Sequence, residues 1–207
     1  MNETVAEVGR IASAEGIDCG FAHGGYVSEA RNPAQWTRTQ AEVQSWRSWG
    51  FGEDHMQLLD ADQARARIAA ADVLGGTFTP HCAALHPYEL VVGLGRVVAA
   101  MGVAIHEGTT VTAIDGRTVR TDHGEVRAEV VVRATEGYTA DLPGAHRDIV
   151  PMYSLMVATE PIDDDTWARV GLSGRATFSD KRHLRIYGQR TRDGRIAFGG
   201  RGAPYHY

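Results

Sequence analysis

Glu129–Tyr138, with the sequence Glu-Val-Val-Val-Arg-Ala-Thr-Glu-Gly-Tyr, is the stretch from which we derive the fold. Its unbroken valine run is typical of a strand that is buried on both faces of a parallel or mixed sheet. The run ends in Ala134, Thr135 and Gly137, whose small size lets the backbone approach whatever lies beyond the sheet edge. In open α/β sheets, ligands bind outside the carboxyl ends of the strands. An ordinary core strand ending in a glycine turn fits the same residues, so both interpretations stay open here.

The overall composition is that of a globular protein without a nucleic-acid partner. The chain has 207 residues, 43% of them hydrophobic, which suffices for one large or two small domains. Its formal net charge is -5 and its 21 lysines and arginines are scattered, whereas a nucleic-acid surface needs clustered basic residues. No apolar run approaches the ~20 residues that span a bilayer, and the first residues lack the pattern of a signal peptide. We therefore expect a cytoplasmic protein with no membrane partner.

Few residues point to metal or hydrolytic chemistry. The nine histidines include no pair at helical ligand spacing, and Cys-x-x-Cys is absent, so we expect no metal site. Cys19 and Cys82 are far apart and fit buried thiols of a reduced compartment. The sequence has no Gly-x-Ser-x-Gly elbow for a nucleophilic serine. His86, which precedes Pro87, is interpreted as a helix cap.

Helices and strands alternate in the first part of the chain. Asn32-Pro33 is a helix start, and Asp60 with Gln63 forms the pattern of a capping box. Gly24-Gly25 is interpreted as the turn of a hairpin. The predicted helices are residues 4–15, 33–50 and 61–68, and the predicted strands are 17–22, 26–30 and 74–79.

A strongly apolar helix is predicted from His86-Pro87 to Gly102. Gly93 and Gly95 inside this helix cost about 1 kcal/mol each relative to alanine, so we expect a neighbour to press closely against that face. Gly93-x-Gly95 is not a dinucleotide fingerprint, because it lies within a helix and the third glycine is absent.

Short strands dominate the rest of the sequence. Asp115-Gly116 and Asp193-Gly194 are two-residue hairpin signals, and Pro161 with the acidic run that follows it predicts one short helix through Trp167. The opening stretch then becomes the last strand of a meander. The predicted strands are residues 103–106, 110–114, 118–121, 126–132, 149–159, 176–179, 184–190 and 195–199.

These elements predict an α/β fold, in the sense of a mixed α+β arrangement with an inserted antiparallel ribbon. Changes in the pattern divide the chain into residues 1–80, 81–148 and 149–207.

The sequence resembles the FAD-dependent amine and D-amino-acid oxidases, in particular the group of glycine oxidase, sarcosine oxidase and γ-glutamylputrescine oxidase. The resemblance runs the full length of the chain, because several weak motifs occur in the family's order and spacing. These motifs are Gly24-Gly25, His86-Pro87, Glu107-Gly108-Thr109-Thr110-Val111, Ala134-Thr135-Glu136-Gly137-Tyr138, Pro151, and Asp193-Gly194-Arg195 leading to Gly199-Gly200.

The resemblance implies a discontinuous FAD-binding domain, with residues 81–148 as its central part, and a sheet-rich substrate domain built from residues 1–80 and 149–207. It places Thr110 and Val111 along the adenosine half of FAD, through the backbone of the valine. It brings Ala134, Thr135 and Gly137 to the dinucleotide from the strand end. Tyr187 matches a tyrosine that lies over the substrate carboxylate, although simple packing in a half-buried strand also explains a tyrosine there.

The reaction that the resemblance implies is oxidation of a carbon–nitrogen bond in a small amine or amino acid. A hydride passes to the flavin, the imine product is hydrolysed by water, and oxygen reoxidises the flavin. The substrate would be the only partner indicated, and the sequence gives no oligomeric state.

Two family segments are not found in the sequence. The Gly-x-Gly-x-x-Gly turn that receives the pyrophosphate would precede residue 1, and the last flavin strand would follow Tyr207. We therefore expect a central fragment, a truncated reading frame or one piece of a longer protein. Two other functions stay open: a non-catalytic fragment that serves as a binding module, and a flavin dehydrogenase or monooxygenase with another electron partner.

Overall fold

The computed structural model describes residues 2–150 and 152–202, and the chain divides into two compact units. Unit 1 consists of residues 1–98 and 154–207, and unit 2 consists of residues 99–153. Pro151, which was predicted to open a strand, lies outside the described residues.

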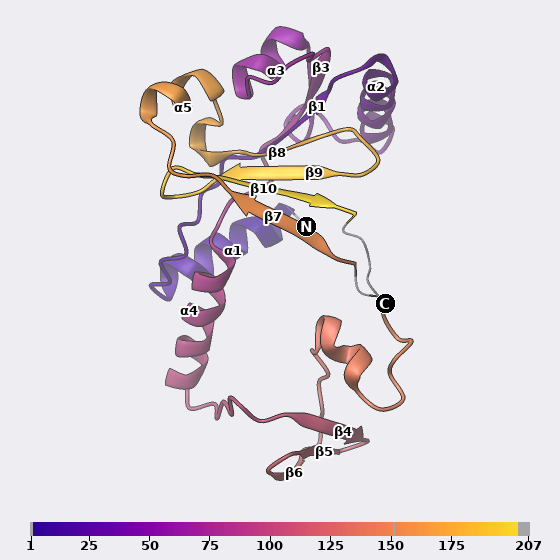
Figure 1. The fold of residues 1–207 in the computed structure, drawn as a ribbon, viewed down its shortest axis with the longest axis vertical. Coiled ribbons are helices and arrows are strands. Elements are labelled where there is room, and N and C mark those ends of the chain that lie inside the picture. Colours follow the sequence, from indigo (N-terminus) through magenta and orange to yellow (C-terminus); the bar gives the residue numbers. More distant parts are fainter. Residues whose placement is uncertain (1, 151, 203–207) are drawn as a thin grey trace. The chain divides into compact units, whose positions relative to one another are not determined.

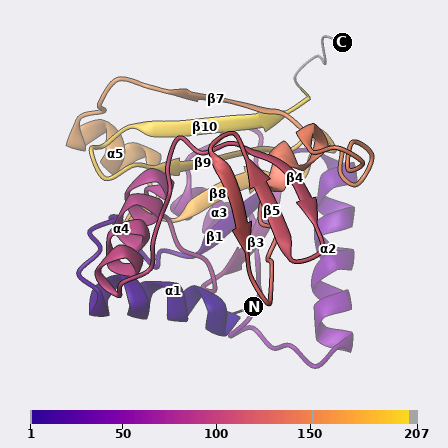
Figure 2. The ribbon, with the colours of Figure 1, turned by 90° about the horizontal axis from the view of Figure 1, so that it is seen from below.

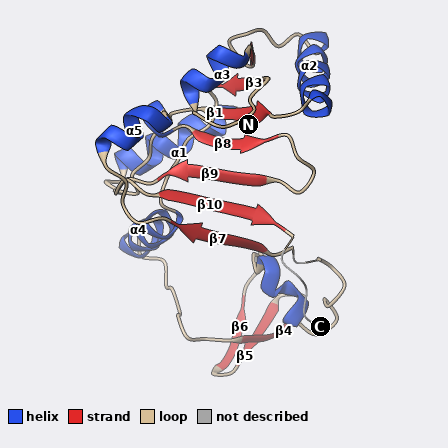
Figure 3. Cartoon of the chain, turned by 45° about the horizontal axis from the view of Figure 1, so that its top comes forward, coloured by secondary structure: helices blue, strands red, loops and turns tan. Residues whose placement is uncertain are grey.

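A seven-stranded mixed sheet forms the centre of unit 1 (Figure 3). Its strands lie in the order β2-β3-β1-β8-β9-β10-β7, in which β1 and β8 are parallel and all other neighbours are antiparallel. The parallel pair joins the first part of the chain to the last part within one sheet. The strands are β1 Tyr26–Ala30, β2 Gln57–Leu59, β3 Gly75–Thr79, β7 Ser154–Ala158, β8 Thr177–Asp180, β9 Ile186–Arg190 and β10 Ile196–Arg201.

Helices lie on two sides of this sheet (Figure 1). On one side, the main core joins Val27 of the sheet to Ala64 of α3 and Trp167 of α5. On the other side, Ala12 of α1 packs with Leu90 of α4, and the two helices lie side by side (Figure 2). The helices are α1 Asn2–Ala14, α2 Pro33–Ser48, α3 Ala61–Arg67, α4 Pro87–Ala100 and α5 Asp164–Val170.

The predicted helix starts are confirmed by their caps. The side chain of Asn32 accepts a hydrogen bond from the backbone N–H of Gln35 at 2.9 Å, with Pro33 in the first turn of α2. Asp60 and Gln63 form both bonds of the capping box at the start of α3. These bonds satisfy N–H groups that a helix leaves without an internal partner, which is why such local signals locate helices well.

The two glycines of α4 have different surroundings. A Cβ added at Gly93 would lie 2.3 Å from Cγ2 of Ile17, so the close neighbour that we predicted is present there. A Cβ added at Gly95 would meet no described atom within 4 Å, so the same prediction is wrong for Gly95. A helix contacts a neighbour along one stripe only, and positions two residues apart point in different directions.

The predicted hairpin of residues 17–22 and 26–30 is wrong. Residues 17–22 contain only an isolated bridge, from Ala22 to Ala84, and the carbonyl oxygen of Cys19 accepts from the N–H of His86 at 2.8 Å. The predicted partner β1 pairs instead with β3 and β8. Both edges of β1 are therefore paired with strands that do not adjoin it in the sequence. The turn signal at Gly24-Gly25 could not indicate this pairing.

Unit 2 contains the predicted three-stranded antiparallel meander, in the order β4-β5-β6, but its last strand ends at Arg127 and does not extend to residue 132 as predicted. Its strands are β4 Val111–Asp115, β5 Thr118–Thr121 and β6 Gly124–Arg127. The predicted strand 103–106 is absent from the structure of these residues, where Val103 and Ile105 are exposed.

The stretch Glu129–Tyr138 does not form the buried strand that we expected. Residues 129–135 have no regular structure, and Val130 and Val132 are 77% and 81% exposed. A 3-10 helix, η1, covers Glu136–Asp141. A β-branched run forms a strand only where a neighbouring strand pairs with it and an apolar layer covers it. Within the described residues, unit 2 offers 129–135 neither.

The last part of the chain follows the sequence pattern more closely. β7 occupies part of the predicted strand 149–159, α5 begins at the Asp163 cap, and β9 and β10 form the hairpin about Asp193-Gly194. The mixed α/β fold class is thereby confirmed. Among the helices of residues 2–150 and 152–202, none is long and apolar enough to cross a membrane.

Candidate functional site

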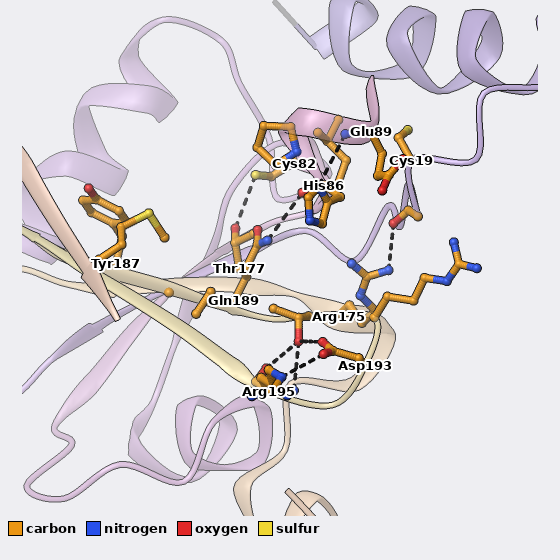
Figure 4. Close-up of a pocket in the computed structure, with 18 of the residues that line it drawn as sticks. Cys19, Cys82, His86, Glu89, Arg175, Thr177, Tyr187, Gln189, Asp193 and Arg195 are labelled. Carbon is orange, nitrogen blue, oxygen red and sulfur yellow. Dashed lines mark hydrogen bonds and ion pairs between the residues drawn. The ribbon is translucent and has the colours of Figure 1, made fainter. Parts of the chain in front are cut away.

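A cavity of about 1240 Å³ lies in unit 1, between the sheet and the segment that leads into α4 (Figure 4). It is larger than the usual range of about 300–1,000 Å³ for small-molecule sites, and its lining is mainly apolar, as in most such sites. Residues 18–20 and 82–89 contribute one wall, and strands β1, β7, β8, β9 and β10 contribute the other. The cavity is therefore assembled from segments that are distant in sequence.

Strand β9 provides a row of side chains along the cavity. Tyr187 and Gln189 line it, as expected for alternate residues on one face of a strand, and Thr191, just beyond the end of β9, continues the row. The ring of Tyr187 lies against Gly199 of β10, where an added Cβ would be 2.5 Å from Cε2 of the ring. Gly199 thus gives the Tyr187 ring room to lie flat on the sheet, which accounts for a glycine at this position.

The wall opposite β9 is fixed by polar contacts. Nδ1 of His86 accepts a hydrogen bond from the backbone N–H of Glu89 at 3.4 Å, which confirms His86 as the cap of α4. Gln189 donates to the carbonyl oxygen of Leu85 at 3.5 Å. Cys82, which is only half-buried, has its Sγ 3.4 Å from Oγ1 of Thr177. These contacts join the α4 segment to the sheet across the cavity.

Two ion pairs lie where residues 191–195 border the cavity. Arg192 binds Asp18 at 2.6 Å, and its hydrogen bond holds the pKa of the Asp18 carboxyl below its usual value. Arg195 binds Asp193 at 2.8 Å. The pKa of Asp193 is lowered first by the hydroxyl of Thr191 and then by Arg195. Both carboxylates are therefore ionised and already paired.

Arg175 lines the same cavity but pairs with no carboxylate among the described residues. Its Nε donates to the carbonyl oxygen of Arg190 at 3.2 Å, and one terminal nitrogen donates to that of Gly20 at 2.7 Å. Burial lowers the pKa of Arg175, and the neighbouring guanidinium groups of Arg192 and Arg190 act in the same direction. An arginine still keeps its charge under such conditions.

The five predicted cofactor residues lie in unit 2. Thr110 exchanges hydrogen bonds with Asp122, and Val111 begins β4, an edge strand of the meander. Thr135 binds the hydroxyl of Thr139 at 2.7 Å, and an added Cβ at Gly137 would meet no described atom within 4 Å. Ala134 precedes them in the irregular segment.

Within the described part of the chain, no hydrogen bond links Thr110 or Val111 to Ala134, Thr135 or Gly137. What they offer a dinucleotide is backbone: one side of β4 at Val111 has no strand beside it, and the space at Gly137 is open. Unpaired backbone N–H and C=O groups at a strand edge can bind a ligand without a specific side chain. The residues present therefore fit an adenosine contact of the kind expected.

Metal chemistry finds no support in the arrangement of side chains. In the two described ranges, no three histidine, cysteine or carboxylate side chains lie grouped as metal ligands. What the cavity offers is an apolar enclosure, a phenol at Tyr187 and a guanidinium at Arg175, a combination that suits binding and orienting a substrate.

The family model for "FAD dependent oxidoreductase" (DAO) matches residues 1–207, the whole chain. The chain belongs to the FAD-dependent oxidoreductase family. The family is FAD dependent, so the cofactor expected from the sequence is the cofactor of the family. The resemblance stated from the motifs is confirmed by this match.

Two curated relatives have similar sequences. The γ-glutamylputrescine oxidoreductase of Escherichia coli is 28% identical over 189 residues, which are 89% of this chain and 43% of the relative. A probable oxidoreductase OrdL of Rhizobium meliloti is 28% identical over 158 residues, 74% of this chain and 36% of the relative. The chain thus spans less than half the length of these two proteins.

Solved structures show that the fold is shared. Glycine oxidase from Geobacillus kaustophilus has a TM-score of 0.76 at 18% identity, over 97% of this chain and 55% of its own. L-Proline dehydrogenase from P. horikoshii has the same TM-score at 17% identity, over 98% and 54%. At this identity the likeness is one of fold alone.

Sequence reasoning found Tyr187 but missed Gln189 and Arg175 in the cavity. Gln189 could have been predicted as a lining residue, because it lies two residues after Tyr187 on the same strand and therefore on the same face. Arg175 lies outside any strand, in a turn that only the structure shows.

Proposed function

We propose that this chain provides the substrate pocket of an FAD-dependent oxidoreductase that oxidises a carbon–nitrogen bond of an amine or amino acid. The observation that carries the proposal is the position of Tyr187, in the cavity of unit 1 and on the strand where the resemblance expects a substrate contact. Relatives named as a γ-glutamylputrescine oxidoreductase, a glycine oxidase and an L-proline dehydrogenase all support a substrate that carries an amine or amino-acid nitrogen.

The residues of the cavity would hold and orient this substrate. The Tyr187 hydroxyl would donate a hydrogen bond to a carboxylate, a charge-assisted bond that is stronger than one between neutral groups. Apolar walls, among them Met156, Phe178 and Leu85, would exclude water from the reacting carbon. When bound, FAD supplies the acceptor for the hydride. An amine that binds neutral needs no side chain to take the carbon-bound proton, and the proposal assigns no general base.

Residues of unit 2 would contact the cofactor. Val111 would do so through its backbone beside Thr110, and Ala134, Thr135 and Gly137 would let the dinucleotide approach the chain closely. With them we retain the proposal that residues 81–148 belong to the cofactor domain and residues 1–80 and 149–207 to the substrate domain; residues 81–98 of the former pack in unit 1, where several of them line the cavity.

The first test asks whether the 207-residue chain holds FAD. The purified chain is incubated with FAD, desalted and examined by absorbance spectroscopy. A flavin band that survives desalting is the expected result, and it would exclude the inactive binding module. Loss of all flavin would favour that module instead.

The second test asks which acceptor is used. Hydrogen peroxide is measured while a panel of amines and amino acids is added to the flavin-loaded protein. Release of peroxide with at least one of them supports the oxidase. Flavin reduction without peroxide would favour a dehydrogenase with another electron partner.

A further inference from the structure

Arg175 presents an uncompensated positive charge to the cavity. A guanidinium has five N–H donors, and two of those on Arg175 are used by the carbonyl oxygens of Gly20 and Arg190. Three donors remain. The side chain is half-buried, so they are not simply surrounded by bulk water. A partly desolvated guanidinium of this kind is stabilised when an anion pairs with it.

The protein itself provides no such anion in the part of the chain that the structure describes. The nearby cations have partners of their own: Arg192 binds Asp18 at 2.6 Å, and Arg190 lies 3.9 Å from Asp164. Arg175 forms no salt bridge with any described carboxylate; its hydrogen bonds all go to backbone oxygens. The positive charge at this end of the cavity is thus available to a ligand.

The backbone that carries Arg175 is strained. Leu172 and Arg175 have φ angles of 57° and 60°, in the left-handed region that side chains other than glycine rarely adopt. Such strain is unfavourable and is concentrated at functional sites. The turn, η2 (Ser173–Arg175), is held by close packing, because an added Cβ at Gly24 would lie 2.3 Å from the carbonyl oxygen of Gly174.

The turn and its two backbone bonds fix the guanidinium at a defined place in the cavity. Arg175 binds the backbone of Arg190, and Tyr187 precedes Arg190 by three residues on the same strand. At about 3.4 Å per residue, the two sites are roughly 10 Å apart along β9. Figure 4 shows Tyr187 and Arg175 at different ends of the group of lining residues, with Thr177 and Gln189 between them.

We propose that Arg175 anchors a further carboxylate, at the far end of an elongated substrate whose reacting amine end, with any carboxylate beside the nitrogen, lies at Tyr187. This rests on the proposed function, and it adds a substrate class: amines with a carboxylate several bonds away from the nitrogen. A guanidinium suits this role, because its planar N–H fork binds the two oxygens of a carboxylate together.

Direct binding tests this assignment without any flavin chemistry. The probes are ε-aminocaproate and n-hexylamine, which share the amine and the chain length and differ in having a carboxylate or a methyl group at the far end. Their affinities for the 207-residue chain are measured by calorimetry. We expect the carboxylate to bind on the order of tenfold more tightly.

Three variants assign the effect. Arg175→Met, which removes the charge at similar side-chain length, should bind both probes equally. Arg175→Lys, which keeps the charge but not the fork, should retain only part of the preference. Arg201→Met, an exposed arginine outside the cavity lining, removes the same net charge and should keep the wild-type ratio.

Several results would overturn the proposal: equal affinities in the wild type, an unchanged ratio in Arg175→Met, or displacement of ε-aminocaproate by inorganic pyrophosphate at equal concentration. The last result would assign Arg175 to a phosphate group. The two proposals fail separately. Binding that depends on Arg175 can persist when no amine is oxidised. Conversely, amines can be oxidised even when ε-aminocaproate and n-hexylamine bind with equal affinity.

Discussion

Arg175 donates a hydrogen bond to the carbonyl oxygen of Gly20 at 2.7 Å, across 155 residues of sequence. The bond joins the segment between α1 and β1 to the turn before β8, and both segments line the cavity. A change that moves either segment should therefore alter the cavity and the stability of unit 1 together.

A substitution at Gly24 should disturb this connection between the two segments most directly. Gly24→Ala would place a Cβ 2.3 Å from the carbonyl oxygen of Gly174 and 2.6 Å from the backbone nitrogen of Ala176. Backbone atoms cannot rotate away, so we expect a loss of roughly 1–3 kcal/mol in the free energy of unfolding. Chemical denaturation measures this loss. Gly200→Ala is the control, because its Cβ would lie at ordinary contact distances of 3.8 Å and more; equal effects of the two substitutions would contradict the packing described.

Two glycines in α4 make a second matched pair. Gly95→Ala adds a methyl group in open space and should raise the free energy of unfolding by up to about 1 kcal/mol through helix propensity. Gly93→Ala should lower it, because the added Cβ would lie 2.3 Å from the stiff, branched side chain of Ile17. Thermal unfolding of both variants provides the comparison, and the prediction fails if Gly93→Ala is as stable as Gly95→Ala.

The ionisation of Glu29 should make the free energy of unfolding depend on pH. Glu29 lies on β1 and is only 4% exposed, and its Oε1 has no hydrogen-bond partner among the described residues. Burial raises the pKa of Glu29 from 4.5 to about 7; the Arg31 charge opposes this shift, Asp180 adds to it, and Arg65 opposes it. The folded state therefore prefers the protonated carboxyl.

The sign of the effect follows from the two protonation states. Below about pH 4.5, Glu29 is protonated whether the chain is folded or not, and its burial costs no ionisation. Between 4.5 and about 7, only the unfolded chain releases the proton, so stability falls as pH rises and stays lower above pH 7. At about 1.4 kcal/mol for each pH unit, the loss is on the order of 3 kcal/mol.

Glu29→Gln removes this ionisation and should be more stable than the wild type at pH 8 but not at pH 4. Urea denaturation at both pH values measures the difference. Identical pH profiles of the two proteins would show that Glu29 ionises freely in the folded state.

Tyr187→Phe tests the substrate contact. Loss of one hydrogen bond to a charged group should raise the Michaelis constant for carboxylate-bearing substrates by roughly tenfold and leave the flavin content unchanged. Tyr88→Phe, on the exposed part of α4 and outside the cavity lining, serves as the control. If the constant for Tyr187→Phe equals that of the wild type, the tyrosine only packs against Gly199.

Local signals in the sequence predicted the parts of the fold that depend on local chemistry. The caps at Asn32 and Asp60 and the hairpin at Asp193-Gly194 were located correctly, because each is decided by hydrogen bonds within a few residues. Pairing between distant strands was not accessible in this way. The parallel junction of β1 with β8 replaced the hairpin expected for residues 17–30.

The two interpretations of Glu129–Tyr138 as a strand assumed neighbours that the pattern cannot supply. Three successive valines favour burial in a strand. Such burial needs a pairing strand and a covering layer, and the described residues of unit 2 provide neither at Val130 or Val132. At the candidate site, Tyr187 followed from the resemblance to the oxidase family. Arg175 did not, because a left-handed turn at an arginine leaves no mark in the sequence.

The most direct test of the central claim is the flavin absorbance of the FAD-loaded protein during anaerobic addition of amines and amino acids. We predict that at least one of them bleaches the flavin band, and that Tyr187→Phe needs a higher concentration of a carboxylate-bearing substrate for the same bleaching. A bound flavin that stays oxidised with every amine and amino acid tested would contradict the assignment of the cavity as the substrate pocket of a carbon–nitrogen oxidoreductase.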